Sequence, residues 1–251
     1  MQKYYIGKIG VNITNLQDTI EKITYCIENK DFGYICVTNS RTVYLANHDD
    51  KYLKIQNESL MTVPDGTPLV WIARNSGYKN VSRVSGPDLF PAVLELSKSK
   101  GYSHYFFGST PETITKIEGK MKRDYPTLDV KGAVSPPFQP IADFDIDALA
   151  EEINRLKPTF FWCGLGAPKQ EQLMALLQPK LESTICVGVG LVFEYFAGTV
   201  SRAPVIIQKL GLEWLHRLLQ QPVKMIRFIK PFMWISVNLF QSFFNKNNPI
   251  Y

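Results

Sequence analysis

Short apolar runs alternate with amphipathic segments between about residue 34 and residue 200 of the chain. Runs of this length, bounded by turn residues and separated by helical patterns, are typical of β-strands that α-helices connect into a parallel sheet. The predicted strands are residues 34–38, 60–63, 104–107, 130–134, 159–163 and 185–189. The pattern therefore predicts an α/β protein with a mainly parallel sheet flanked by helices.

Two of these strands are followed by residues that start helices. Residues 108–112 read GSTPE, and residues 164–168 read GLGAP. Ser or Thr caps a helix, Pro is favoured at its first position, and Glu interacts well with its positive end. Helices are therefore expected to begin near Pro111 and Pro168.

The composition and the charge distribution narrow the class of protein. The chain has 251 residues, of which 45% are hydrophobic and 20% charged. These values exclude a disordered chain and a multi-span membrane protein. Residues 201–251 hold 7 Lys and Arg against 1 acidic residue, a balance of +6, whereas residues 1–200 hold 21 against 22, a balance of −1. The sequence is therefore divided into a core at 1–200 and a basic C-terminal appendage at 201–251.

The four cysteines form no CxxC pair, and three of them lie in apolar, strand-like runs. They are expected to be buried free thiols in a reducing compartment. The three histidines lie near no cysteine pair, which disfavours a structural zinc site. The first residues lack the apolar stretch of a secretory signal, so the protein is expected to stay in the cytoplasm.

Residues 160–173, FFWCGLGAPKQEQL, place two glycines at a strand end and a helix directly after them. Helix starts beside glycine loops bind anions through backbone N–H groups. The segment is not a dinucleotide fingerprint, because Lys169 occupies the third glycine position, and it lacks the GxxxxGK[ST] pattern of a P-loop. The alternative is a tight turn that needs glycine only for its backbone. Lys169 and Gln170 favour the phosphate site.

Asp65 follows the predicted strand 60–63 in the sequence TVPDGTPL. Open α/β sheets bind ligands at the carboxyl ends of their strands. Thr38 and Asn39 follow the first predicted strand in the same way, so polar groups from two strand ends are expected to converge on one crevice. The alternative for residues 64–66 is a simple turn, because Asp and Gly are frequent in turns.

Asp143, Asp145 and Asp147 alternate directly before a helical pattern. A DxD pair holds a divalent metal in some nucleotide-sugar enzymes, but helix capping and dipole compensation explain the same residues and are favoured here. The chain has no GxSxG motif and no evident Cys–His pair, so covalent hydrolase chemistry has little support.

The C-terminal segment combines basic and aromatic residues. Lys224, Arg227 and Lys230 fall within an arc of roughly 120° on a helix of about 100° per residue. Between Lys230 and Lys246 lie 15 uncharged residues, fewer than the roughly 20 that a membrane-spanning helix needs. This composition favours an interfacial helix on an anionic membrane surface. The alternative is an apolar helix that packs on the domain or on another copy of the chain in a homo-oligomer.

No nucleic acid is expected as a partner, because residues 1–200 contain no basic stripe and no sequence motif of a nucleic-acid-binding domain.

The motifs occur in a fixed order along the chain. They are VTN at 37–39, PDG at 64–66, RVSGPDL at 83–89, FG at 107–108, GLGAPKQE at 164–171, GVG at 188–190, AGT at 197–199, RAP at 202–204 and GLEW at 211–214. This ordered set resembles the WecG/TagA/CpsF glycosyltransferase family over about residues 6–230. PDG alone is weak, whereas the whole set in this order is highly specific.

The resemblance implies a Rossmann-like fold and an inverting transfer of a hexose-type sugar from a UDP-sugar to a polyprenyl-diphosphate-linked saccharide. It implies no bound metal and no other cofactor. The reaction would take place at the cytoplasmic face of the bacterial membrane, with the protein bound peripherally. The pathways that the family serves build capsule and exopolysaccharide, teichoic acid linkages or enterobacterial common antigen.

The resemblance also implies roles for individual residues. Asp65 matches the family's catalytic aspartate, which takes the proton of the acceptor hydroxyl. Thr38 and Asn39 would position a sugar, and Arg83 and Gln170 would hold the diphosphate together with the glycine loop. The other implied substrate-binding residues are Gly108, Gly164, Gly166, Lys169, Gly190, Glu194, Arg202, Arg217, Lys224 and Arg227.

The sequence departs from the family pattern in three places. Glu194 stands where members usually have an aspartate that contacts the nucleoside. Lys224 interrupts an otherwise all-arginine pattern in the appendage. Residues 135–138, SPPF, replace the Gly-Tyr-Phe of teichoic-type members, which favours the exopolysaccharide branch.

Two other functions stay open at this point. One is a nucleotide-sugar hydrolase or epimerase that uses the same phosphate loop, although the Tyr-xxx-Lys pair and GxGxxG motif of an epimerase do not appear in the right places. The other is a non-catalytic membrane scaffold, against which the intact Asp65, Thr38 and Gln170 argue.

Overall fold

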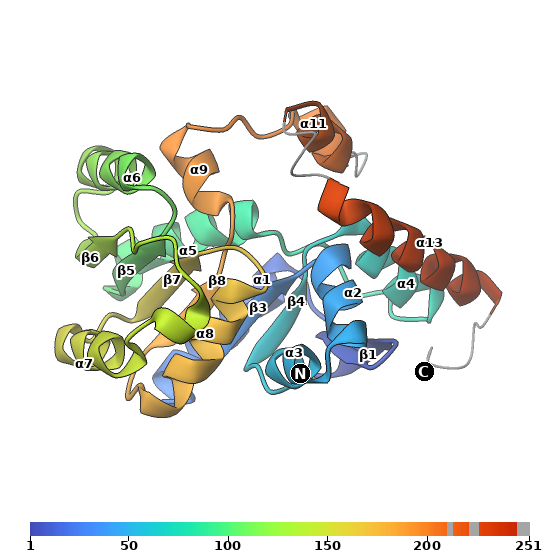
Figure 1. Cartoon of the computed structure of the whole chain (residues 1–251), viewed down its shortest axis with the longest axis horizontal. Helices are drawn as coiled ribbons and strands as arrows, with labels where there is room; N and C mark the ends of the chain where they lie inside the picture. The colour runs from blue at the N-terminus through green and yellow to red at the C-terminus, as the bar shows by residue number, and fades with distance from the viewer. Residues whose placement is uncertain (210–212, 221–225, 245–251) are drawn as a thin grey trace.

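A six-stranded parallel sheet forms the centre of the computed structural model, which describes residues 1–209, 213–220 and 226–244 (Figure 1). The strand order is β4-β3-β8-β7-β5-β6, with β3 at Tyr34–Thr38, β4 at Met61–Pro64, β5 at Ser103–Gly108, β6 at Asp129–Val134, β7 at Phe160–Gly164 and β8 at Ile185–Gly188. Every pairing between neighbours is parallel. The predicted α/β class is confirmed, and each predicted strand matches to within one residue at its ends.

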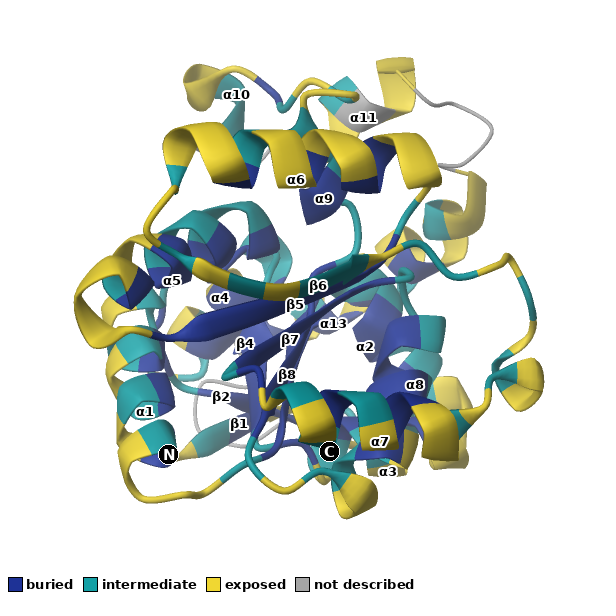
Figure 2. Cartoon of the chain, turned by 90° about the vertical axis from the view of Figure 1, so that its left-hand side faces the viewer, coloured by how far each residue is buried: buried dark blue, intermediate teal, exposed yellow. Residues whose placement is uncertain are grey.

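Successive residues of the central strands pack on opposite faces of the sheet. In β7, Phe160 and Trp162 belong to a first core, and Phe161 and Cys163 belong to a second. The first core lies under α1 (Leu16–Glu28), α5 (Gly86–Lys100), α6 (Pro111–Asp124) and α9 (Val192–Ala197), and the second lies under α7 (Ile146–Leu156) and α8 (Lys169–Leu177). Figure 2 shows the buried strands between these helices. Because both faces are covered, the strands are nearly continuous apolar runs, which is why the sequence pattern reveals them.

A third core lies beside the edge strand β4 and was not predicted. It joins a hairpin of β1 (Lys3–Ile6) and β2 (Ile9–Asn12) to α2 (Ser40–His48), α3 (Asp50–Asn57), α4 (Thr67–Asn75) and α13 (Ile229–Phe244). The hairpin strands have only four residues each, and Gly7 turns the chain between them with a φ of 61°. Strands this short carry too little periodicity to stand out in the sequence.

One face of α13 belongs to the third core. Ile235 is 1% exposed, and the Trp234 ring meets the rings of Tyr44 and His48 edge-on. The Asn75 amide donates a hydrogen bond of 3.0 Å to the Ser242 hydroxyl. The C-terminal helix therefore packs against α2 and α4 rather than standing away from the sheet domain (Figure 1).

The opposite face of α13 is apolar and exposed. Its exposed apolar residues are Ile229, Phe232, Met233, Val237, Phe240 and Phe243. No helix in the described part of the chain is both long enough and apolar enough to span a bilayer. The remaining elements are η1 (Ile141–Asp143), η2 (Gln178–Lys180), α10 (Val205–Lys209), α11 (Glu213–Gln220) and η3 (Ile226–Phe228).

The helix starts follow the capping rules that the sequence indicates. The Thr110 hydroxyl accepts from the Thr113 N–H ahead of Pro111, and Asp145 accepts from the Ala148 N–H. Capping therefore explains Asp145. Pro168 stands one position before the first residue of α8 rather than at it. All four cysteines are buried free thiols, as predicted.

Candidate active site

A cleft of about 1170 Å³ opens at the carboxyl ends of the parallel strands. Its walls are the segments that follow each strand of the sheet, together with residues of α11, η3 and α13. These strand ends lie on one edge of the sheet, where open α/β sheets bind ligands. Most of the predicted site residues line this cleft, namely Asn39, Asp65, Arg83, Gly164, Gly166, Lys169, Gln170, Gly190, Glu194 and Arg227.

Asp65 lies at the end of β4, where its backbone N–H donates to the Thr38 carbonyl at 2.7 Å. Its side chain is 23% exposed, and the Arg83 Nε lies 3.4 Å from its Oδ1. Burial raises the pKa of the Asp65 carboxyl to about 7, even though the Arg83 charge acts in the opposite direction. The negative charges of Glu213 and Asp88 add to this increase. A carboxyl that titrates near neutral pH is well matched to the work of a general base.

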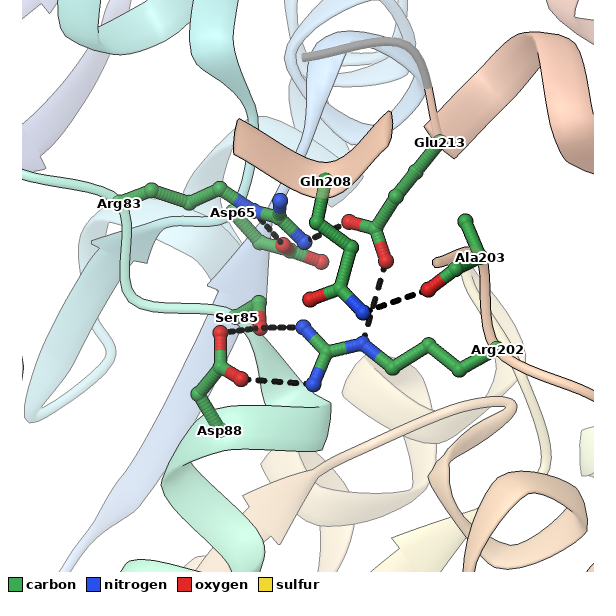
Figure 3. Close-up of polar contacts among 8 residues, drawn as sticks. All are labelled: Asp65, Arg83, Ser85, Asp88, Arg202, Ala203, Gln208 and Glu213. Carbon is green, nitrogen blue, oxygen red and sulfur yellow. Dashed lines mark hydrogen bonds and ion pairs between the residues drawn. The ribbon is translucent and has the colours of Figure 1, made fainter. Parts of the chain in front are cut away.

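Arg83 is shared between two carboxylates (Figure 3). Its Nε donates to Asp65, and its Nη2 donates to Glu213. Glu213 also accepts from the Arg202 Nε at 3.1 Å, and Arg202 Nη1 donates to Asp88 at 2.7 Å. Burial acts to lower the pKa of both guanidinium groups, but the surrounding carboxylates have the larger effect, so both pKa values are raised. Arg202 does not line the cleft, so its predicted direct contact with substrate does not fit this placement.

Gln170 joins two of the glycine loops. Its buried Oε1 accepts from the Gly166 N–H at 3.1 Å and from the Gly190 N–H at 2.9 Å. Its Nε2 donates to Glu171 at 2.8 Å. The Gln170 Oε1 therefore holds the two loops together, and at least one Nε2 hydrogen is directed away from the loops toward Glu171. Gly166 and Gly190 have φ angles of 78° and 56°, which glycine adopts without strain.

A buried chain of polar side chains runs on from Gln170 to β3. The nearby Tyr52 hydroxyl acts to lower the pKa of Glu171, and this hydroxyl accepts from Gln56 Nε2 at 2.9 Å. The Thr38 hydroxyl donates to Gln56 Oε1 at 2.8 Å, and Thr38 is fully buried. The prediction that Thr38 contacts a sugar therefore does not fit its placement, because its hydroxyl faces the protein interior. Burial raises the pKa of Glu171, which lies behind the cleft.

Asn39 and Arg41 extend from the end of β3 into the cleft. The Asn39 Oδ1 caps α2 by accepting from the N–H groups of Arg41 and Thr42, so its side-chain NH₂ is the group that it offers to a ligand. Arg41 was not predicted. Its Nη1 donates to the Ala167 carbonyl at 2.7 Å and so links α2 to the glycine loop that follows β7.

Gly108 and Gly164 allow β5 and β7 to approach closely at their ends. Gly108 has a φ of 130°, and a Cβ there would lie 2.6 Å from the carbonyl carbon of Gly164. A Cβ on Gly164 would lie 2.5 Å from the Phe193 ring. Gly164 lines the cleft, whereas Gly108 does not. Gly108 therefore serves the backbone geometry of the site rather than substrate contact.

Two further predicted residues lie along the cleft on the β5, β6 and β7 side. Glu194 Oε1 accepts from the Ser109 hydroxyl at 2.9 Å. The Lys169 Nζ donates to the Gln139 carbonyl at 3.0 Å and lies 4.4 Å from the centre of the Phe138 ring. Phe138 is 99% exposed. The segment 135–138, whose sequence departs from the family pattern, therefore forms part of the cleft wall.

The basic residues of the appendage are only partly described. Arg227 lines the cleft from η3. Arg217 belongs to α11, but its side chain lies outside the description, and Lys224 lies outside the described residues altogether.

Sequence reasoning missed Arg41, Ser109 and Glu213, all of which line the cleft. Arg41 lies two residues after Asn39, and Ser109 directly follows Gly108, so both lie just beyond strand ends that the sequence pattern had indicated. Glu213 is the single acidic residue of segment 201–251. Such an isolated carboxylate among basic residues is a signal for an ion pair.

Three sequence matches relate this chain to known proteins. The chain matches the sequence model of the glycosyl transferase WecG/TagA/CpsF family over residues 4–248. A protein of Bacillus subtilis (strain 168) named N-acetylglucosaminyldiphosphoundecaprenol N-acetyl-beta-D-mannosaminyltransferase is 27% identical over 224 residues, which are 89% of this chain and 85% of that protein. The protein of the same name from Staphylococcus aureus (strain NCTC 8325 / PS 47) is 28% identical over 215 residues, 84% of this chain and 83% of that protein. The resemblance carried by the motifs is confirmed over nearly the whole chain.

Proposed function

This chain belongs to the WecG/TagA/CpsF glycosyltransferase family, and we propose that it moves a hexose-type sugar from a UDP-sugar to a polyprenyl-diphosphate-linked saccharide with inversion at the anomeric carbon. The observation that carries the proposal is the Asp65 carboxyl, which lies in the cleft beside Arg83 and has a pKa of about 7. The relatives named above transfer an N-acetylmannosaminyl group to a diphosphoundecaprenol-linked sugar, which supports this class of acceptor.

In the proposed reaction, an acceptor hydroxyl oxygen attacks the anomeric carbon of the donor. Asp65 takes the hydroxyl proton, a new glycosidic bond forms, and the bond from the anomeric carbon to UDP breaks. UDP leaves with the electron pair. Arg41, Arg83, Lys169 and Arg227 line the cleft, and their positive charges would stabilise the diphosphate as it departs. We therefore propose that the reaction needs no metal ion.

The pH dependence of transfer follows from the raised pKa of Asp65. Below about pH 7 the carboxyl is protonated and cannot accept the acceptor's proton. We expect kcat/KM to rise with pH through this value and to level off about one unit above it. Initial rates of UDP release across this range test the expectation. An acid limb near 4, the ordinary value of an aspartate, would contradict it.

We also propose that the protein works at the cytoplasmic face of the membrane, in capsule, exopolysaccharide, teichoic acid or common-antigen synthesis, and binds an anionic membrane through its C-terminal helices. The exposed face of α13 is apolar, and Leu215, Leu218 and Leu219 of α11 are exposed as well. Trp214, Leu218, Phe232 and Met233 line the cleft, so apolar surface continues from the cleft outward. A prenyl-linked acceptor could then reach the cleft while its chain stays in the lipid.

The membrane proposal is tested by charging the exposed face of α13. Met233→Glu with Val237→Glu should lower binding to anionic liposomes by roughly tenfold or more, because two apolar side chains no longer enter the interface. Thr115→Glu with Ser99→Glu adds the same charge at exposed positions elsewhere and should change binding little. These substitutions leave Ile235 in the third core, whereas deletion of α13 would uncover that core.

Liposome sedimentation with and without salt measures the effect, since an electrostatic contribution weakens as ionic strength rises. Equal sedimentation of both double variants would contradict the membrane proposal. A second copy of the chain is the alternative partner for this face. Analytical ultracentrifugation without lipid would reveal it as a dimer or larger form that the Met233 and Val237 substitutions dissociate.

A further inference from the structure

Glu213 occupies an unusual place for the single acidic residue of the C-terminal segment. Its side chain is 18% exposed and bridges two guanidinium groups, with one oxygen on Arg83 and the other 3.1 Å from the Arg202 Nε. Arg83 in turn touches the proposed base, Asp65. A carboxylate at the start of α11 therefore reaches the reacting part of the cleft through one arginine (Figure 3).

Arg202 holds the Glu213 carboxylate through the oxygen that does not contact Arg83. Arg202 Nη1 donates to Asp88 at 2.7 Å, and its Nη2 lies 3.4 Å from the Ser85 hydroxyl. Ser85 also donates to Asp88, so the two residues at the start of α5 bind the Arg202 guanidinium group together. Glu213 is thus held by an arginine that is itself anchored to the sheet domain.

The charges of this cluster do not balance. Asp65, Glu213 and Asp88 contribute −3 against +2 from Arg83 and Arg202, which leaves −1. Because Arg83 divides its hydrogen bonds between two carboxylates, it neutralises Asp65 less than an undivided partner would. The nearby negative charge of Glu213 favours the protonated form of Asp65 further.

We propose that Glu213 is a positioning residue for sugar transfer, which holds Arg83 between two carboxylates and thereby sets how readily Asp65 takes and gives up a proton. The inference rests on the proposed role of Asp65 as the base. It also gives the C-terminal segment a specific task at the site, because the charge that tunes Asp65 comes from α11. The role is indirect, since Glu213 acts on Asp65 through Arg83 and through its own negative charge.

The other charged groups of the cleft belong to different elements. Arg41 comes from α2, Lys169 from α8, Glu194 from α9 and Arg227 from η3. Lys169 and Glu194 have contacts of their own with Gln139 and Ser109. In the described part of the chain, Arg83, Glu213 and Asp88 are the charged groups with the largest effects on the pKa of the Asp65 carboxyl. The variants below therefore change one of these three.

The test is a direct titration of Asp65 in the full-length protein, followed by ¹³C NMR of its carboxyl carbon and assigned by the loss of that signal in Asp65→Asn. Glu213→Gln should lower the pKa of Asp65 by roughly one unit, because a negative charge disappears and the Arg83 charge is no longer shared with a second carboxylate. Asp88→Asn removes a carboxylate of the same cluster that does not touch Arg83, and should lower the pKa by less. Glu213→Asp, whose shorter side chain cannot bridge both arginines, should lower it by an intermediate amount and serves where the glutamine variant does not fold.

The pH profile of UDP release gives a second readout, in which the acid limb of Glu213→Gln should move to lower pH by the same amount. A variant that merely loosened α11 would lower the rate at every pH and leave the limb in place. An unchanged Asp65 pKa in both Glu213 variants, or a larger shift in Asp88→Asn, would overturn the inference. The titration needs no substrate, so a wild type without transferase activity would defeat the proposed function while the titration still decides whether Glu213 sets the pKa of Asp65.

Discussion

Asp65→Asn should reduce turnover by roughly 10²-fold to 10⁴-fold while the affinity for UDP changes little, because this substitution removes the base but keeps the shape of the side chain. The asparagine still offers an oxygen to the Arg83 Nε, which lies 3.4 Å from Asp65 Oδ1. The loss should therefore appear in kcat rather than in binding. UDP release kinetics and UDP titration calorimetry measure the two quantities separately.

Asp50→Asn is the matched control for this change. Asp50 forms an exposed ion pair with Lys8 at 3.2 Å, and neither residue lines the cleft. Exposed pairs contribute little to stability. The turnover of Asp50→Asn should equal that of the wild type. If Asp65→Asn turned over at the wild-type rate, Asp65 would have no part in proton transfer, and the mechanism would need another base.

Gln170→Leu should lower the free energy of unfolding by about 2–4 kcal/mol, since it leaves the Gly166 and Gly190 N–H groups without their buried acceptor. Those groups donate to the Gln170 Oε1 at 3.1 and 2.9 Å. The two glycine loops would also lose the side chain that hydrogen-bonds to both of them. Transfer should therefore fall by roughly tenfold or more, because the substrates are misplaced. Chemical denaturation and initial rates measure the two effects.

Gln172→Leu is the comparison on the same helix. Gln172 lies two residues further along α8, is only partly buried, and has no part in the cleft lining. The same change of side chain there should cost little stability or activity. Equal effects at both positions would mean that the loss arises from leucine on α8 and not from the two glycine loops.

The core of the fold and the location of the site could be predicted from the sequence. The strands of a sheet covered on both faces are apolar runs, and parallel strands bring their carboxyl ends to one edge. Asp65 at the end of β4 and Asn39 after β3 therefore had to lie near each other. The capping residues Thr110 and Asp145 were predictable for a similar reason, because a cap depends only on its own helix start.

The direction in which a side chain points could not be predicted. Thr38 and Asn39 are neighbours at one strand end, but successive strand residues face opposite sides, and Thr38 turns to Gln56 in the interior. Gln170 stands beside the glycine loop as expected, yet its amide binds the loop backbone. Both residues match the family motif, and the motif does not separate support from substrate contact.

Contacts between residues far apart in the sequence could not be predicted either. Glu213 and Arg83 are 130 positions apart and Arg202 and Asp88 are 114 apart. No periodicity or motif spacing connects such residues, so their pairing follows only from where α11 and α5 lie. The packing of Ile235 into the third core is a case of the same kind, because the composition of the aromatic tail favoured an interfacial membrane helix over a helix packed on the domain.

The central claim is an acceptor-dependent transfer from a UDP-sugar without a metal, and UDP release in the presence of EDTA tests it most directly. UDP-glucose, UDP-N-acetylmannosamine, UDP-N-acetylglucosamine and their uronic acids are supplied in turn with a prenyl-diphosphate-linked sugar, with Asp65→Asn beside the wild type. We expect release from one donor that requires the acceptor, survives EDTA and is lost in the variant. Release that is independent of the acceptor, or that stops in EDTA and returns with added Mg²⁺ or Mn²⁺, would contradict it.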